Sequence, residues 1–348
     1  MAEQVLGAGP GGTPSRATIA EVAARAGTSV STVSKVLNGR PGVSDAKRDE
    51  VLELLHGIGY QRRGEGRRSR SNLIDVVLPY INSLWAVRLL DGAEREAERA
   101  GVALVVSAMA GRTLGNRLWL ERFKQRRSDG LLIIAQRIRP ELADELPRLR
   151  APCTMIDAQG AGIPGVPSVG STNLTGARDA TAHLVELGHR RIGIITGPTD
   201  LVYSQQRLDG YRAALARGGI TPNQAYEKYG GFTIESGYQM GGELLDLPQP
   251  PTAIFAGSDL QAHGLYQAAR ERGVSIPDEL SVVGFDNLQS CEWASPELTT
   301  INQPLEDMAG LALRMLVNMA HHDLAPNASR VELATSLVVR QSTAPPPA

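Results

Sequence analysis

Four outward-facing side chains on one predicted helix carry chemical groups that can read DNA bases. Residues 17–38 predict two helices joined by a turn, and the second helix leaves four side chains outward: Val30, Ser31, Ser34 and Lys35. Serine and lysine hydrogen-bond to base edges, and valine packs on the thymine methyl group. In the DNA-binding form of such a helix pair, the second helix enters the major groove. The alternative is an ordinary pair of helices at the edge of a core.

Capping and packing residues must position this second helix. Thr18 and Glu21 have the spacing of a capping box at the start of the first helix. Gly27 supplies the turn, and Ser29 is a favourable N-cap for the second helix. One apolar face of each helix is expected to pack: Ile19, Val22, Ala23, Ala26, Val33, Val36 and Leu37. A third helix is predicted to start at Ser44.

Residues 17–60 closely resemble the headpiece of the lactose-repressor/galactose-repressor (LacI/GalR) family of bacterial transcription factors. The matching residues are Thr18-Ile19, Val22-Ala23, Ala26-Gly27, Ser29, Thr32-Val33-Ser34, Asn38, Val43-Ser44 and Gly59-Tyr60. The resemblance implies a double-stranded DNA operator as partner, with bases read by Val30, Ser31 and Lys35. It also implies that a second set of residues contacts phosphates or caps helices: Thr18, Ser29, Thr32, Ser34 and Asn38.

Length and composition indicate an ordinary globular protein of two or three domains, because the chain has 348 residues, 42% hydrophobic and 21% charged. No apolar run approaches the ~18–20 residues of a membrane span, and the start lacks an apolar signal core. We therefore expect a cytoplasmic protein with no membrane association. Cys153 and Cys291 lie far apart without a CxxC pair, which argues against a disulfide framework or a zinc site. No metal or other cofactor is expected.

The net charge of −1 hides a basic segment around the predicted headpiece. Residues 16–70 contain eleven Lys or Arg against six Asp or Glu, so the rest of the chain is acidic. Because phosphate neutralisation supplies much of nucleic-acid affinity, this charge lies where DNA binding requires it. A solvated basic surface is the alternative. Residues 1–16, rich in Gly, Pro and Ala, predict a disordered tail.

The linker, residues 61–72, departs from the family. Most relatives carry a short hinge helix whose leucine enters the minor groove, whereas this segment has two glycines and no leucine. Glycine costs about 1 kcal/mol in a helix, so a stable hinge helix is not expected. One hypothesis is that Arg67, Arg68 and Arg70 reach a minor groove. The other is a flexible linker with general phosphate attraction.

From Leu73 to residue 343 the pattern changes to an α/β alternation of strands and amphipathic helices. Six apolar runs predict buried parallel strands: 73–78, 103–106, 130–134, 191–195, 253–256 and 281–284. Helices are predicted over 89–100, 174–187, 211–217, 260–272 and 305–319, and a last strand over 336–340. This alternation predicts doubly wound parallel sheets, which bind ligands beyond the carboxyl ends of their strands. An unrelated α/β enzyme core is the alternative.

Further motifs make residues 73–343 similar to the effector-binding and dimerisation region of the same family. They are Leu184-Val-Glu-Leu-Gly-His-Arg-Arg-Ile-Gly, Arg207-Leu-Asp-Gly-Tyr, Pro251-Thr-Ala-Ile-Phe-Ala, Ser281-Val-Val-Gly-Phe-Asp and Pro296-Glu-Leu-Thr-Thr-Ile. The resemblance implies two lobes, similar to those of periplasmic sugar-binding proteins, that close over a ligand. It implies chain crossings near Ser171-Thr172, Thr299–Gln303 and Arg330. Residues 344–348 are expected to be a tail.

The resemblance also implies an effector site at the strand ends: Trp85, Gln136, Asp157, Gln205, Arg207, Phe232, Ser258 and Asp286. Carboxylates such as Asp286 accept two hydroxyl donors, which suits a polyol. Taken singly, each residue could instead be structural. The position that commonly carries an effector-binding arginine in the family is Gln205 here, which favours a neutral sugar over an anionic ligand.

The expected function is a repressor that a neutral sugar or oligosaccharide releases from its operator. The chain shows no nucleophile elbow, HExxH or Walker loop, so an enzyme is not expected. A sugar-handling enzyme with an attached DNA-binding domain and a regulator controlled by a protein corepressor are the alternatives. Because the C-terminal tail has no leucine heptad of the kind that makes tetramers, we expect a homodimer.

Overall fold

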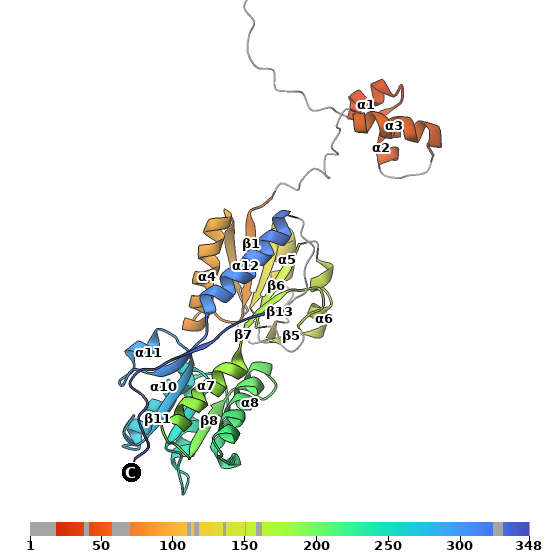
Figure 1. Ribbon diagram of the computed structural model, residues 1–348. Helices are drawn as coiled ribbons and strands as arrows, with labels where there is room; N and C mark the ends of the chain where they lie inside the picture. The colour runs from red at the N-terminus through yellow and green to blue at the C-terminus, as the bar shows by residue number, and fades with distance from the viewer. Residues whose placement is uncertain are drawn as a thin grey trace, which may run out of the picture. The chain divides into compact units, whose positions relative to one another are not determined.

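The computed structural model describes residues 19–37, 42–57, 70–109, 113–114, 118–134, 137–149, 151–157, 162–322 and 330–347. The chain forms two compact units, residues 1–70 and 71–348, and each is considered by itself (Figure 1). Several predicted site residues lie outside the described residues: Thr18, Asn38, Gln136, Arg67 and Arg68.

In the described residues of the first unit, three helices form a headpiece: α1 (Ile19–Arg25), α2 (Val30–Leu37) and α3 (Asp45–Gly57). Its core joins one face of each helix: Val22, Ala23, Ala26, Val33, Val36, Val51 and Leu55. Gly27, with φ +54°, makes the turn between α1 and α2, a conformation that glycine adopts without steric cost. These features agree with the sequence prediction for this segment.

The second unit contains two lobes. The sheet of the N-terminal lobe has six strands within the described residues: β1 (Leu73–Leu78), β2 (Ala103–Ala108), β4 (Gly130–Ile134), β6 (Cys153–Ile156), β7 (Ser168–Ser171) and β13 (Arg330–Leu333). Their order is β13-β7-β6-β4-β1-β2, and all pairs are parallel. Its other elements are α4 (Leu84–Ala100), α5 (Leu118–Arg126), α6 (Pro140–Ala143), a 3-10 turn (Leu146–Arg148), α12 (Leu305–His322) and the strand pair β3 (Thr113–Leu114) and β5 (Arg137–Ile138).

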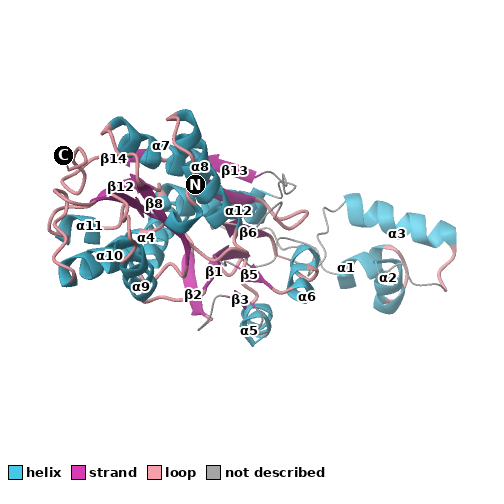
Figure 2. Ribbon diagram, turned by 90° about the horizontal axis from the view of Figure 1, so that it is seen from below, coloured by secondary structure: helices cyan, strands magenta, loops and turns pink. Residues whose placement is uncertain are grey.

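The C-terminal lobe repeats this plan. Its sheet has six strands within the described residues: β8 (Ile192–Thr196), β9 (Glu227–Tyr229), β10 (Ala253–Ala256), β11 (Ser281–Asp286), β12 (Thr299–Asn302) and β14 (Ser336–Val338). Their order is β14-β12-β11-β10-β8-β9, and only the described β12–β14 pair is antiparallel. Helices flank this sheet on both faces (Figure 2): α7 (Asn173–Glu186), α8 (Val202–Arg217), α9 (Ile234–Leu245), α10 (Asp259–Glu271) and α11 (Ser290–Trp293), with a 3-10 turn at Gln224–Tyr226.

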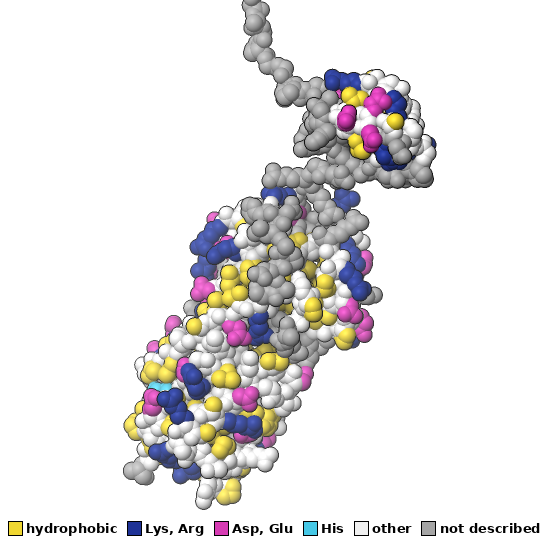
Figure 3. Space-filling model, turned by 45° about the vertical axis from the view of Figure 1, so that its right-hand side comes forward, with side chains coloured by type: hydrophobic (Ala, Val, Ile, Leu, Met, Phe, Trp, Pro, Cys, Tyr) yellow, Lys and Arg dark blue, Asp and Glu magenta, His cyan; other side chains and the backbone are white. Residues whose placement is uncertain are grey.

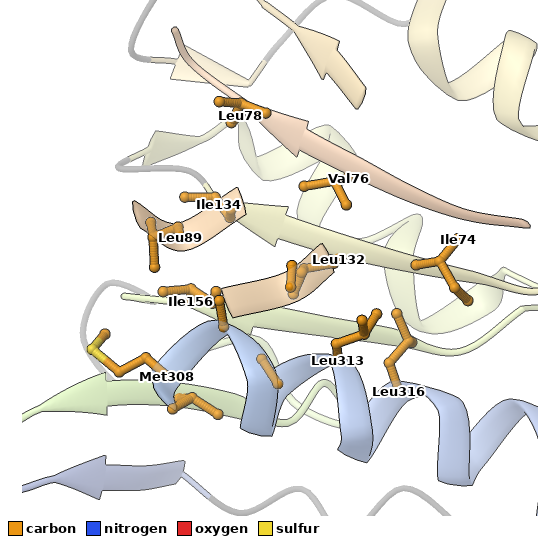
Figure 4. Close-up of a cluster of buried hydrophobic side chains, with 14 of the residues drawn as sticks. Ile74, Val76, Leu78, Leu89, Leu132, Ile134, Ile156, Met308, Leu313 and Leu316 are labelled. Atoms are coloured by element: carbon orange, nitrogen blue, oxygen red, sulfur yellow. The ribbon is translucent and has the colours of Figure 1, made fainter. Parts of the chain in front are cut away.

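One hydrophobic core of the N-terminal lobe lies between the sheet and α4 with α12, and a second includes Trp119, Phe123 and Leu142. Side chains of β1, β4 and β6 meet α12 residues such as Leu313 and Leu316 (Figure 4). Because these strands are buried on both faces, they read in the sequence as continuous apolar runs, which is typical of parallel sheets. The doubly wound α/β fold predicted from the sequence is therefore confirmed.

The chain passes between the lobes three times within the described residues. It leaves the first sheet after β7 at Thr172, returns at Gln303-Pro304 between β12 and α12, and crosses again at Ala334-Thr335 between β13 and β14. Hydrogen bonds tie the crossings together: Gln303 Nε2 donates to Ser171 Oγ at 2.9 Å, and the Thr335 amide donates to Thr172 Oγ1 at 3.0 Å. The three crossings lie close to the expected ones.

Some boundaries differ from the sequence prediction. Helix α4 starts at Leu84, because Ser83 caps it by accepting a hydrogen bond from the Ala86 amide. Helix α8 starts at Val202 rather than residue 211, which places Gln205 and Arg207 on a helix. The C-terminal segment, expected to be a tail, bonds to the C-terminal lobe: Ala344 N donates to Ser281 Oγ at 3.0 Å. None of the helices in the described part of the chain has the length and hydrophobicity of a membrane span.

Candidate functional site

One face of α2 presents the residues predicted to read bases. Val30 is 52% exposed. Ser31 and Lys35 are also exposed, and Ser34 is half-buried, while Val33 and Val36 pack into the headpiece core. The exposed face therefore offers one apolar and two polar groups.

Polar contacts fix the start of this helix. The Thr32 amide donates to Ser29 Oγ at 3.1 Å, which is the N-cap that the sequence predicts. Ser29 Oγ also lies 2.7 Å from Ser31 Oγ and 2.9 Å from Thr32 Oγ1. Lys47 Nζ of α3 donates to the Ala26 carbonyl at 2.9 Å and so satisfies the end of α1. These contacts hold α2 on the bundle while its outer face stays open.

A cavity of about 350 Å³ lies between the two lobes of the second unit. Its walls come from the carboxyl ends of β1, β4, β6 and β11 and from the starts of several helices. The lining residues are Pro79, Tyr80, Asn82, Ser83, Trp85, Ile134, Ile156, Asp157, Tyr203, Arg207, Phe232, Thr233, Ser258, Leu260, Asp286 and Leu288. This is where doubly wound sheets bind ligands.

Arg207 is the buried cation of this cavity, with an exposed fraction of 5%. Its Nε donates to Asn173 Oδ1 at 2.9 Å, and its Nη1 donates to the Gly257 carbonyl. The guanidinium carbon lies 3.6 Å from the centroid of the Phe285 ring, and Nη2 lies 3.9 Å from Asp286 Oδ1. These contacts fix the planar group in one orientation, and its charge faces the cavity carboxylates.

Two carboxylates face Arg207. Burial raises the pKa of Asp157 to about 6, although Arg207 and Arg330 oppose the shift. Burial also raises the pKa of Asp286 above its ordinary value, with Arg207 opposing and the nearby Asp259 and Asp157 reinforcing the shift. The cavity therefore offers several hydrogen-bond acceptors to hydroxyl groups.

Aromatic rings line both sides of the cavity. Tyr80 and Trp85 belong to the N-terminal lobe, and Tyr203 and Phe232 belong to the C-terminal lobe. The centroids of Tyr203 and Phe232 lie 5.7 Å apart with a tilt of 31°. Flat apolar faces beside hydroxyl acceptors match the two kinds of surface that a sugar ring presents.

The structure brings six of the predicted effector residues to this cavity: Trp85, Asp157, Arg207, Phe232, Ser258 and Asp286. Gln205 does not line it: this side chain is exposed, and its Nε2 donates to the Thr199 carbonyl at 2.7 Å. We therefore place the arginine of the site at Arg207, which corrects the inference that the arginine is replaced. Ser258 also caps α10 by accepting from the Gln261 amide.

Several lining residues were not predicted from the sequence. Tyr203 lies one helical turn before Arg207 on α8, so helical periodicity could have found it once the helix start was known. Tyr80, Asn82 and Thr233 lie in loops, where no periodic pattern identifies the direction of a side chain. Among the described residues, no group of three His, Cys, Asp or Glu side chains could hold a metal ion.

Comparison with known protein families gives two matches. Residues 18–63 match the family of bacterial regulatory proteins of the lacI type. Residues 181–343 match the periplasmic binding protein-like domain. The two matches thus cover the headpiece and most of the C-terminal half of the chain.

Individual relatives match along nearly the whole length. The HTH-type transcriptional repressor CytR of Escherichia coli (strain K12) is 33% identical over 330 residues, which is 94% of this chain and 96% of that protein. The structure of the transcriptional regulator CelR in complex with cellobiose is similar with a TM-score of 0.70 and 32% identity, covering 94% of this chain and 100% of that one. The lac repressor dimer bound to operator and the anti-inducer ONPF has a TM-score of 0.69 and 26% identity, covering 94% and 99%.

Proposed function

Because this chain belongs to the LacI family of bacterial regulatory proteins, we propose that it is a homodimeric repressor which a neutral sugar or oligosaccharide releases from its operator. The membership itself makes the chain a DNA-binding transcriptional regulator with an effector domain, and not an enzyme. The finer statements, namely the sugar, the direction of the response and the dimer, are the proposal.

The observation that carries the sugar proposal is the set of groups in the cavity. Asp157 and Asp286 offer hydroxyl acceptors, Arg207 offers donors, and aromatic faces lie on both lobes. A phosphosugar would bring two negative charges that repel the ionised Asp157, in a cavity where burial already disfavours charged carboxyls. A neutral polyhydroxy ligand satisfies the same groups without that repulsion. A similar regulator has been solved with cellobiose, which makes this disaccharide the first probe.

The test is a thermal-shift screen of the full chain against neutral mono- and disaccharides, phosphosugars and nucleobases, followed by operator titration with each hit. A neutral sugar that raises the melting temperature and weakens operator binding supports the proposal. A hit that strengthens operator binding reverses the sign and makes the sugar a corepressor. No stabilisation by any sugar would contradict the proposal and favour a protein corepressor.

Two substitutions on one helix provide a matched comparison. Arg207→Met removes the buried cation from the cavity, and Gln205→Ala changes an exposed side chain two residues away on α8. Loss of the sugar response in Arg207→Met alone is the expected result. Equal loss in both variants would mean that α8, rather than the cavity, is responsible.

The headpiece residues give a second test. We propose that Val30, Ser31 and Lys35 read bases, while Ser29, Thr32, Ser34, Thr18 and Asn38 contact phosphates or cap helices. Selection of binding sites from random DNA should then give altered sequences for Lys35→Ala. Ser34→Ala should weaken binding to all sequences alike.

The oligomeric state and the linker complete the proposal. The chain mass is 37.2 kDa, so light scattering should give about twice that value for a homodimer. A mass of four chains would contradict the dimer. We also propose that Arg67, Arg68 and Arg70 contact the minor groove beside the operator; Arg70, the described member of this group, is exposed.

A further inference from the structure

We propose that Arg88 is a positioning residue that links the two lobes beside the cavity and holds Trp85 and Asp286 in the arrangement that the ligand requires. The inference deepens the proposed function because it concerns how the same site is controlled. Its ligand-binding part rests on that function, whereas its structural part does not.

Arg88 uses its whole guanidinium group in this contact. Nε and Nη2 donate to the two carboxylate oxygens of Glu306, both at 2.6 Å. Nη1 donates to the Asn287 carbonyl at 2.6 Å and lies 3.4 Å from the Asp286 carbonyl. Arg88 belongs to α4 and Glu306 to α12, both in the N-terminal lobe, while Asn287 follows β11 of the C-terminal lobe. The bidentate, charge-assisted pair with Glu306 therefore fixes the guanidinium group within the N-terminal lobe. The bond from Nη1 to the Asn287 carbonyl is the contact that joins the two lobes.

The segment that receives Arg88 has an unusual backbone. Asp286 and Asn287 have φ values of 115° and 56°, which side chains other than glycine rarely adopt. Such a conformation persists only where the surroundings hold it. The C-terminal lobe contributes Asp259, whose Oδ2 accepts from the Leu288 amide at 2.7 Å, and Arg340, which donates to Asn287 Oδ1 at 2.8 Å. Arg88 supplies a restraint from the opposite lobe.

The two helices that carry Arg88 and Glu306 are in close contact. A Cβ at Gly92 would lie 2.2 Å from the Glu306 carbonyl oxygen, so α4 and α12 touch backbone to backbone one turn beyond Arg88. Glu306 also lies three residues after Gln303, where the chain crosses between the lobes. The backbones that carry Arg88 and Glu306 are therefore fixed relative to each other, and the Arg88–Glu306 pair lies next to the crossing.

The link has a consequence for ligand binding. Trp85, three residues before Arg88, lies on the same side of α4 and lines the cavity. Asp286, one residue before Asn287, lines the cavity from the other lobe. A ligand that contacts both side chains needs the lobe arrangement that Arg88 holds. Without the link, that arrangement is less populated, and the measured affinity falls by the same fraction.

The test compares Arg88→Met with Arg314→Met. Arg314 of α12 also pairs with a carboxylate of α4, Glu96, at 2.9 Å, but this pair lies within one lobe. Spin labels are attached at Glu94→Cys on α4 and Arg217→Cys on α8, which are both exposed positions. Double electron–electron resonance then measures the distance between the two labels and so the separation of the lobes. Cys153 and Cys291 are buried and so resist labelling. The full chain is measured without ligand, mixed with unlabelled chain to remove distances between copies.

We expect one narrow distance distribution for the native sequence and for Arg314→Met, and a broader one for Arg88→Met. Arg88→Lys should be intermediate, because one ammonium cannot bond all three oxygens in the same geometry. Equal distributions for the native chain and Arg88→Met would overturn the proposal, as would equal broadening in Arg314→Met. Melting curves for each variant show that the comparison is made on folded protein.

A second experiment measures the Kd of cellobiose for the native chain and for both variants. Where cellobiose binds the native chain, Arg88→Met should raise its Kd by about tenfold and Arg314→Met should leave it unchanged. An unchanged Kd in Arg88→Met would overturn the ligand part of the inference. If no tested sugar binds the native chain, the sugar proposal fails, while the ligand-free distances still decide the role of Arg88.

Discussion

Sugar binding should weaken as the pH falls, because the cavity carboxylates accept sugar hydroxyls best when they are ionised. Burial raises the pKa of Asp157 to about 6. With that value, about 96% of this carboxyl is ionised at about pH 7.4, but only about 9% at about pH 5. If the ionised form alone binds the sugar, the Kd rises by about tenfold over this range, a change of about 1.4 kcal/mol. Asp286, whose pKa is also raised, changes affinity in the same direction.

The same ionisation affects the ligand-free fold in the opposite direction. A carboxyl whose pKa is higher in the folded than in the unfolded chain stabilises the fold below its ordinary pKa of 3.8 and loses this contribution as the pH rises through about 6. Asp157→Asn removes the titration. The free energy of unfolding of Asp157→Asn, relative to the native chain, should therefore increase as the pH rises through about 6.

Titration calorimetry with cellobiose at several pH values, together with urea unfolding at the same values, tests both statements. Asp157→Asn should bind more weakly at neutral pH and should lose the part of the pH dependence centred near 6. Ser258→Ala, also at the cavity wall, is the control that keeps the carboxyl. An affinity that stays constant or increases toward pH 5 would refute the assignment of Asp157 as an ionised hydroxyl acceptor.

Three further predictions concern packing, capping and the linker. Gly92→Ala should lower the free energy of unfolding by about 1–3 kcal/mol, because its Cβ would lie 2.2 Å from the Glu306 carbonyl oxygen. The control is Gly310→Ala, whose Cβ would lie 3.5 Å from the Gly92 carbonyl oxygen. In the same urea titration, Gly310→Ala should lower the free energy of unfolding by less. Ser29→Ala should destabilise the headpiece by about 1 kcal/mol through loss of the N-cap, and unchanged headpiece melting would contradict this. Arg67→Ala with Arg68→Ala should change operator preference in a binding-site selection; a uniform loss across sequences would favour general phosphate attraction.

The local patterns that predicted the fold were those with strong physical constraints. Ser29 and Gly27 mark the turn of the headpiece, because few residues cap a helix or adopt positive φ so readily. The buried parallel strands were visible as apolar runs such as residues 130–134, since both faces of each strand are covered. The start of α8 was not visible, because Leu201 at its N-cap provides no side-chain cap and its first turn has no acidic residue.

The residues of the cavity could be predicted only in part, because some of them depend on where a helix starts or on how the lobes meet. Carboxylates at the carboxyl end of a strand, such as Asp157 just after β6 and Asp286 at the last position of β11, lie at the sheet edge whatever the loops do. The choice between Gln205 and Arg207 depended on the helical phase of α8, which the sequence did not reveal. The link from Arg88 to Asn287 depends on how two lobes meet, and 199 positions separate these residues along the chain. No local pattern encodes such a contact.

The position of β1 explains how a ligand in the cavity can affect the other end of the N-terminal lobe. Asp129 anchors the chain just before β1, where its carboxylate accepts from the Ser71 amide at 3.1 Å and the Asn72 amide at 2.9 Å. The other end of β1 leads directly to Pro79 and Tyr80 in the cavity wall. Because β1 pairs with both β2 and β4, it is an interior strand of the sheet of its lobe. We infer that a ligand that favours one arrangement of the lobes also selects the position of Ser71 and Asn72, which Asp129 holds at the start of β1. The size of this effect is set by the difference between the ligand's affinities for the two arrangements.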